Sequence, residues 1–149
     1  MIAPPAADGD FVSTVDGRTE NLVNLPGPVG IATLTSLAGG TSQNVYSFTL
    51  EKQRSQSFVC MGNDTVETSR IEFPAQVNVL AIPKPVKLHD GDVDYSARYT
   101  QDGNAVVWSG TSRSARPTWC ARLTTSAPLK LALEAMIRDL QSQIIVQAG

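Results

Sequence analysis

The sequence predicts an α+β domain in which antiparallel β-strands are followed by one C-terminal amphipathic helix. Short runs of alternating apolar and polar residues recur up to residue 125 and are separated by Gly, Pro and Asp-Gly turns, which is typical of antiparallel strands. From residue 126 the apolar residues recur at spacings of three and four, which is typical of a helix with one apolar face. We expect one domain over residues 1–149, with a flexible Pro-rich arm at 1–9.

A hairpin is predicted for residues 10–25. Its strands are Phe11–Val15 and Arg18–Val23, and Asp16-Gly17 joins them. Such a pair tolerates the positive φ of a tight hairpin turn.

An antiparallel sheet of about five strands is predicted for residues 29–125. The clearest alternation runs from Asn44 to Arg54 and places Tyr46, Phe48 and Leu50 on one face. The stretch from Pro83 to Asp94 is expected to form a loop. The other expected strands are Val29–Thr35, Val66–Phe73, Gln76–Ile82, Tyr95–Thr100, Ala105–Ser109 and Pro117–Thr125.

The helix is predicted for residues 126–145. Ser126 suits a helix cap, and Pro128 is tolerated in the first turn. A lone helix cannot bury its apolar stripe, so it must lie across a sheet of its own chain or of a neighbour. The other sheet face then stays free for function. The stripe comprises Leu129, Leu133, Met136, Ile137, Leu140 and Ile144.

The charge pattern argues against a protein that binds polyanions over its whole surface. The net charge is −2, and only 17% of residues are charged, against about 25% in typical soluble domains. No secretory signal and no stretch of about 18 apolar residues is present, so we expect a soluble protein made in the cytoplasm, without membrane contact.

Residues able to run catalysis or hold a metal are scarce. His89 is the one histidine and lies in a polar stretch. Asp90, Asp92 and Asp94 alternate like the start of a calcium loop, but the required glycine and closing glutamate are missing. The sequence therefore predicts no enzyme, no metal and no cofactor. Cys60 and Cys120 are either two buried thiols, the favoured interpretation, or a disulfide within or between subunits.

The polar face of the predicted sheet is the candidate binding site. Hydroxyl, amide and guanidinium groups can hydrogen-bond RNA bases and phosphates. An ordinary solvent-facing sheet is the alternative interpretation. The candidate RNA-binding residues are Thr49, Gln53, Thr68, Arg70 and Arg122.

Three segments resemble one known family. They are Ser42–Thr49, Arg70–Pro74, and the junction from Arg122 to the helix that contains Leu133 and Met136. Together with the order of elements, they resemble the coat proteins of single-stranded RNA bacteriophages (levivirus-like).

This resemblance implies an N-terminal hairpin, a five-stranded sheet and a helix that packs on the sheet of a partner subunit. It also implies a homodimer, assembly into an icosahedral capsid, and an inner sheet face that binds viral RNA. Thr49, Thr68, Arg70 and Arg122 fall at polar positions of that face. The chain departs from the family in lacking room for a second helix after Ile144.

Two other classes remain open. One is a different self-assembling subunit, such as a phage tail tube or a pilus-like filament. The other is a monomeric β-rich binding domain. The family interpretation places the protein in the virion after synthesis in the bacterial host.

Overall fold

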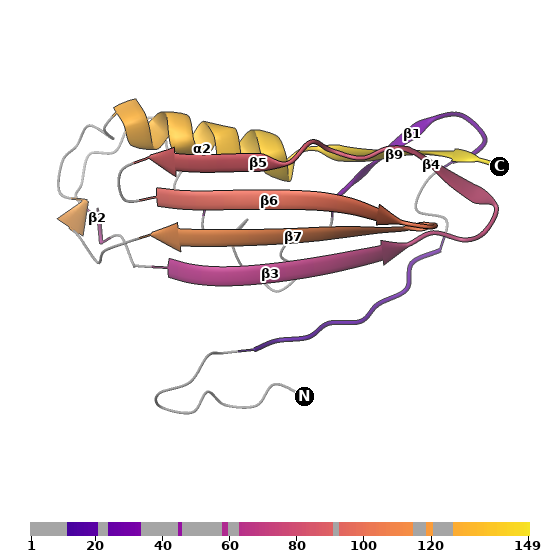
Figure 1. The fold of residues 1–149 in the computed structure, drawn as a ribbon, viewed down its shortest axis with the longest axis horizontal. Helices are drawn as coiled ribbons and strands as arrows, with labels where there is room; N and C mark the ends of the chain where they lie inside the picture. Colours follow the sequence, from indigo (N-terminus) through magenta and orange to yellow (C-terminus); the bar gives the residue numbers. More distant parts are fainter. Residues whose placement is uncertain are drawn as a thin grey trace.

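The structure is a computed structural model that describes residues 12–20, 24–33, 45, 58–59, 63–90, 93–114, 119–120 and 127–149. Antiparallel strands form most of this part, and a helix lies along the larger sheet (Figure 1). The predicted α+β class is therefore supported. The elements are β1 (Val29–Ala32), β2 (Phe58–Val59), β3 (Asn63–Glu72), β4 (Val77–Ala81), β5 (Val86–Asp90), β6 (Val93–Asp102), β7 (Ala105–Ser114), β8 (Trp119–Cys120), α2 (Ala127–Leu140) and β9 (Gln143–Ala148).

The larger sheet has four described strands in the order β3-β7-β6-β5, and all neighbours are antiparallel. Strand β6 shows the alternation that divides its two faces. Tyr95, Ala97 and Tyr99 are buried, whereas Arg98 and Thr100 between and after them are exposed. One face of the sheet is thus covered and the other is open.

A two-residue turn at Gly103-Asn104 connects β6 to β7, since Asp102 pairs with Ala105. The hairpin predicted here is confirmed, and its strands are longer than predicted. Gly103 has a φ of 57°, a left-handed conformation that only glycine adopts at little cost. A tight hairpin turn of this kind requires it.

Replacing Gly103 by valine is expected to lower the free energy of unfolding by about 1–2 kcal/mol, the cost of a left-handed conformation for an L-residue. A Cβ at this position meets no atom within 4 Å, so the cost comes from the backbone and not from a clash. Urea denaturation measures it. Gly17→Val is the control, because Gly17 has open space and no positive φ; equal losses in both variants would contradict the explanation.

Helix α2 covers the larger sheet over β5 and β6. Met136 and Leu140 are buried in one cluster with Tyr95, Tyr99 and Trp108. Leu133 and Ile137 pack against this cluster, so the predicted apolar stripe is confirmed at four positions. The sheet that α2 covers belongs to its own chain.

Asp139 anchors the end of α2 to the sheet. Its side chain is buried, with 5% of its surface exposed. Its carboxyl group accepts hydrogen bonds from the Tyr95 hydroxyl at 2.5 Å and the Tyr99 hydroxyl at 2.9 Å. Burial, with the help of Asp139, raises the pKa of Tyr95. Burial likewise raises the pKa of Tyr99 to about 12.

The predicted helix end is wrong. Helix α2 ends at Leu140, and Ile144 lies in β9, which pairs with β1 on one side and β4 on the other. The β-branched run Ile144–Val146 favours a strand, and pairing on both sides satisfies its backbone. Ile144 and Val146 fill a second apolar cluster; its other buried members are Ile31, Val77 and Val106.

Two further predictions are corrected. Residues 12–20 contain no strand and are exposed throughout, so the hairpin predicted over 10–25 is not formed by the described residues. A two-stranded hairpin without a sheet to pack on is only marginally stable. The loop predicted from Pro83 to Asp94 instead contains β5, whose Val86 and Leu88 pack toward the core while Lys87 and His89 are exposed.

The central strand predicted at 44–54 lies outside the described residues except for Val45, which is helical and buried and so contradicts the prediction there. A short alternating run does not by itself exclude a helical turn. Of the strand predicted at 117–125, Trp119–Cys120 is confirmed and pairs with Phe58–Val59.

Candidate functional site

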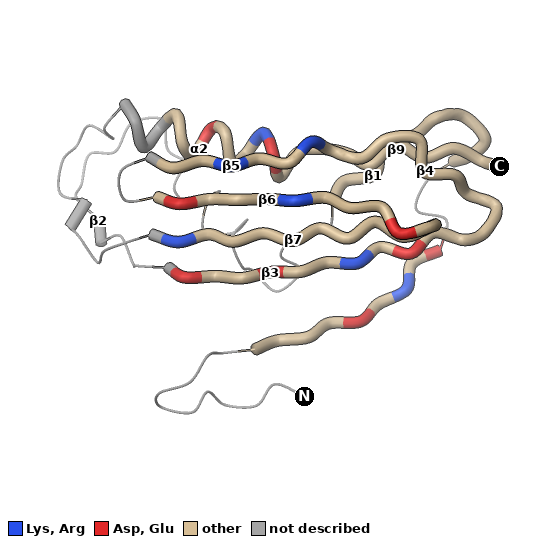
Figure 2. The backbone as a smooth tube through the Cα atoms, viewed as in Figure 1, with Lys and Arg blue, Asp and Glu red and all other residues tan. Residues whose placement is uncertain are grey.

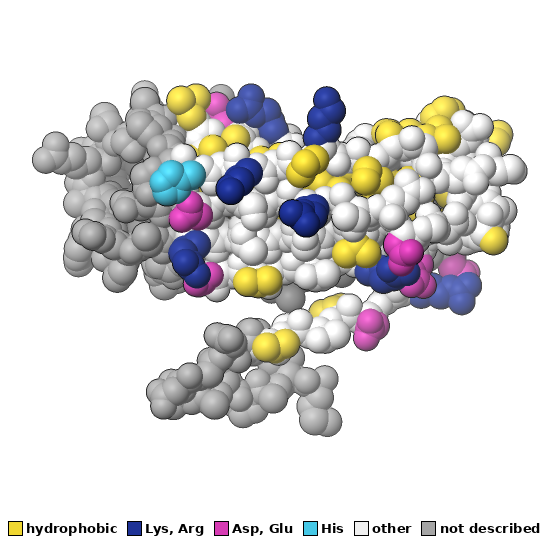
Figure 3. Space-filling view, viewed as in Figure 1, with side chains coloured by type: hydrophobic (Ala, Val, Ile, Leu, Met, Phe, Trp, Pro, Cys, Tyr) yellow, Lys and Arg dark blue, Asp and Glu magenta, His cyan; other side chains and the backbone are white. Residues whose placement is uncertain are grey.

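The candidate site is the open face of the larger sheet, the face turned away from α2. Figure 3 views it directly. We define the open face by the side chains of one alternating set on each strand: Asp64, Val66, Thr68, Arg70, Glu72, Lys87, His89, Asp94, Ser96, Arg98, Thr100, Asp102, Val107, Ser109, Thr111 and Arg113.

One end of the open face carries a row across all four strands in which acidic side chains alternate with Arg113 and His89. The register places Arg113 opposite both Asp64 and Asp94, and His89 opposite Asp94. Arg113 donates from Nε to Asp64 Oδ2 at 3.0 Å. The ring of His89 hydrogen-bonds Asp94 through Nδ1. Opposite charges in direct cross-strand register stabilise a sheet modestly.

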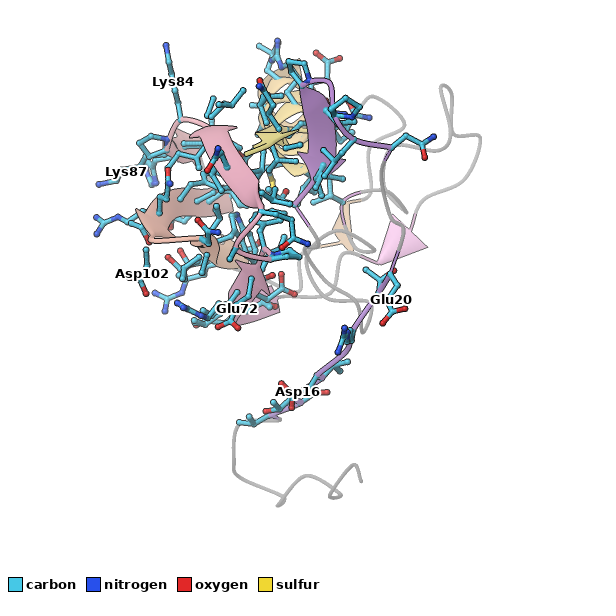
Figure 4. The ribbon with its side chains drawn as sticks, turned by 90° about the vertical axis from the view of Figure 1, so that its right-hand side faces the viewer. Asp16, Glu20, Glu72, Lys84, Lys87 and Asp102 are labelled. Atoms are coloured by element: carbon cyan, nitrogen blue, oxygen red, sulfur yellow. The ribbon has the colours of Figure 1, made fainter. Side chains whose placement is uncertain are left out.

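The other end holds a second ionic group. Arg70 donates from Nε to Glu72 at 2.8 Å and from Nη1 to Asp102 at 3.1 Å. The hydrogen bond to Glu72, followed by that to Asp102, raises the pKa of Arg70. Figure 4 shows Glu72 and Asp102 close together on this side of the molecule. Two carboxyl groups thus compete with any phosphate for Arg70.

The middle of the open face has hydroxyl groups and cations. Thr68, Ser109 and Arg98 stand in one cross-strand row. In the next row the Ser96 and Thr111 hydroxyls are 2.8 Å apart, and Lys87 lies opposite Ser96. In the part of the chain that the structure describes, neither Arg98 nor Lys87 forms an ion pair.

The distribution of charge follows from these rows. On β6, Figure 2 shows acidic positions at the two ends and a basic position between them, and β5 carries a further basic position. Strand β3 has an acidic position mid-strand, Glu67, which is outside the open-face set. Lys84, just before β5, and Lys87 extend outward on the same side (Figure 4). An incoming anion therefore meets its most favourable potential over the middle of the face.

The residues predicted as RNA contacts have different outcomes. Thr68 and Arg70 lie on the open face, as the alternation of β3 indicated. Thr49, Gln53, Arg122 and Cys60 lie outside the described residues. Cys120 is in β8, where only the backbone is described, so the buried thiols predicted for Cys60 and Cys120 and the alternative disulfide both stay predictions.

Sequence reasoning missed Arg98, Lys87, Ser96, Ser109 and Thr111. The sequence did contain a signal for Ser96, Arg98 and Ser109, which lie in the predicted hairpin of β6 and β7. This hairpin alternates, and its apolar set Tyr95, Ala97 and Tyr99 must face the core. The intervening residues then face outward. Lys87 was missed because β5 was interpreted as a loop.

No three His, Cys, Asp or Glu side chains among the described residues gather as metal ligands. No described helix has the length and apolar character needed to cross a membrane.

Comparison of the chain with protein-family models, with curated proteins and with solved structures finds no match.

Proposed function

We propose that the chain is the coat protein of a virus with a single-stranded RNA genome. It dimerises, assembles into an icosahedral shell in the bacterial host, and binds genomic RNA on its inner sheet face. The observation that carries the proposal is the open face: α2 covers one side of the larger sheet, and the other side presents Arg98, Lys87 and a group of hydroxyls. Such groups suit contacts with phosphates and sugars.

The outer edge of β3 supports pairing between copies. Among the described strands β3 pairs only with β7, and it runs for ten residues from Asn63 to Glu72. Long, unpaired edge strands invite pairing with another chain. We place the dimer contact at this edge.

The predicted packing of the helix on a partner's sheet belongs to this proposed dimer. The predicted five-stranded sheet stays a prediction, since the larger sheet has four described strands. The apolar side of α2 already contacts its own sheet, so packing on a partner requires two chains to exchange α2. Exchange of an identical element keeps the same contacts and is a low-cost route to dimers.

Non-reducing electrophoresis tests whether Cys60 and Cys120 link subunits in the shell.

The expected result for the purified chain is a closed particle that contains RNA. Size-exclusion chromatography and electron microscopy test for the particle, and nucleic-acid absorbance tests for RNA. Replacing Arg98 and Lys87 together by alanine is expected to lower the RNA content. Arg138→Ala, on α2 and away from the open face, removes one positive charge as a control. A small monomer in chromatography would overturn the shell, and unchanged RNA content would overturn the proposed face.

A second candidate is a subunit of a tube or filament. Residues 12–20 favour it, because they form an exposed segment without a strand partner among the described residues, with Val12 78% and Val15 58% exposed. Such a segment can add a strand to a neighbouring subunit. Particle shape in micrographs decides between shell and filament, whereas the monomeric binding domain predicts neither.

A further inference from the structure

We infer that the open face holds single-stranded RNA by its sugar-phosphate backbone, reading phosphates and 2′-hydroxyls and not the order of the bases. This inference rests on the proposed function, since it names the part of the RNA that the face recognises. Three properties of the open face carry it: the position of its unpaired cations, the row of hydroxyls beside them, and the absence of aromatic side chains for stacking bases among its described residues.

The unpaired cations form a track for phosphates. Lys87 lies opposite Ser96, so Arg98, two residues further along β6, is its diagonal neighbour, about 7–8 Å away along the sheet. The acidic side chains of the face lie in the end rows and contact Arg113, His89 or Arg70. A bound strand that crosses β6 and β5 in the middle therefore meets Arg98 and Lys87. The carboxyl group diagonal to Lys87, that of Asp94, already contacts His89.

The hydroxyls extend this track toward β3. Thr68 and Ser109 continue the row of Arg98, and Ser96 and Thr111 form the next row. A hydroxyl both donates and accepts, so it fits a phosphate oxygen as well as a ribose 2′-hydroxyl. The 2′-hydroxyl is the group by which a protein distinguishes RNA from DNA.

Among the described residues of the open face, the side chains that usually read bases are missing. Sequence-specific recognition of single-stranded RNA relies on aromatic rings that stack splayed bases. The aromatic residues of β6 and β7, Tyr95, Tyr99 and Trp108, are all buried on the covered face. His89 supplies the one ring of the open face, and it contacts Asp94 at the end row. The open-face set also contains no Asn or Gln.

The test is fluorescence anisotropy of the 149-residue chain with labelled oligonucleotides of about 20 nucleotides, at several salt concentrations. The probes are single-stranded RNAs of unrelated base order and a single-stranded DNA that matches one of them. We expect the Kd values of the RNAs to agree within about threefold, because each base-specific contact would contribute about tenfold or more. We expect the DNA to bind more weakly than its matching RNA.

Variants locate the contact. Arg98→Ala and Lys87→Ala are each expected to reduce the slope of log K against log salt by about 0.7, the value for one phosphate contact on a single strand. Arg138→Ala is expected to leave the slope unchanged. Thr68→Val with Ser109→Ala is expected to reduce the preference for RNA over DNA.

The possible results separate the two proposals. Absence of RNA binding would overturn both the proposed function and this inference. Binding with more than about tenfold preference for one base order would overturn the inference alone. Equal Kd values for RNA and DNA would contradict recognition of the 2′-hydroxyls. Equal slopes of log K against log salt for the Arg98 and Arg138 variants would contradict phosphate binding at Arg98.

Discussion

Asp139→Ala is expected to lower the free energy of unfolding by about 2–5 kcal/mol, because a buried hydroxyl that loses its acceptor costs about 1–3 kcal/mol. The Tyr95 hydroxyl loses its acceptor, and the Tyr99 hydroxyl keeps only its contact with Ser142 at 3.2 Å. Both hydroxyls donate to the Asp139 carboxyl group beneath the end of α2. The same contact joins the helix to β6. We therefore expect loss of helix and sheet packing together in one cooperative transition.

Urea denaturation followed by circular dichroism measures this loss. Asp16→Ala is the matched control, since it removes an exposed carboxyl group from residues 12–20, and we expect a change within about 0.5 kcal/mol. Tyr95→Phe removes one donor but keeps the ring, so its effect should be smaller than that of Asp139→Ala. An Asp139 variant as stable as the Asp16 variant would show that the buried hydrogen bonds do not hold α2.

The same cluster predicts the response to alkali. Burial raises the pKa of Tyr99 to about 12, above the ordinary value of 10.0. A group whose pKa is higher in the folded state contributes its full stability below the unfolded pKa and loses it as the pH rises through the folded pKa. The free energy of unfolding should therefore fall between pH 10 and about 12. In Tyr99→Phe the difference between the free energy of unfolding at neutral pH and at pH 12 should be smaller than in the parent chain.

Gly110→Ala is expected to lower the free energy of unfolding by about 1–3 kcal/mol, the usual cost of overpacking a core. Gly110 is buried in β7, and the ring of Trp108 lies over it on the covered face. A Cβ there would lie 2.3 Å from Cζ2 of that ring. Either the ring or the strand must move, although Trp108 is itself buried against α2 and the neighbouring strands.

A double-mutant cycle tests this explanation. In Trp108→Phe the smaller ring leaves space over residue 110, so adding Gly110→Ala should cost less there than in the parent chain. Gly17→Ala is the control for a glycine with open space around it. Equal costs of Gly110→Ala in both backgrounds would mean that the indole is not the reason for glycine at this position.

Local pattern predicted those parts of the fold that depend on neighbours in sequence. The alternation of Tyr95–Thr100 and the Asp102–Asn104 turn indicated the hairpin, and the spacing of Leu133, Met136 and Leu140 indicated the helix. Strand β9 was missed because its apolar residues continue the helical spacing. Only pairing with β1 and β4, which are distant in sequence, determines that it is a strand.

The candidate site was predictable to a similar extent. Alternation placed Thr68 and Arg70 on a polar face, and the structure agrees. It could not show that Arg70 meets Asp102, because that contact depends on the register of β3 with β7 and of β7 with β6. Nor could it show that Arg98 shares a cross-strand row with hydroxyls, since Ser109 and Thr68 lie on two other strands.

Strand β9 is the central strand of the small sheet, whose order is β1-β9-β4, and this position has a consequence for the order of folding. The β6–β7 hairpin closes over two residues, whereas β9 must find β1, whose residues 29–32 pair with residues 143–146. Pairing between distant segments is slow because the loop entropy is lost before the contacts form. We therefore expect the larger sheet, which contains the β6–β7 hairpin, to form early and the small sheet to form late. Strands β1 and β4 are then joined only when β9 inserts between them.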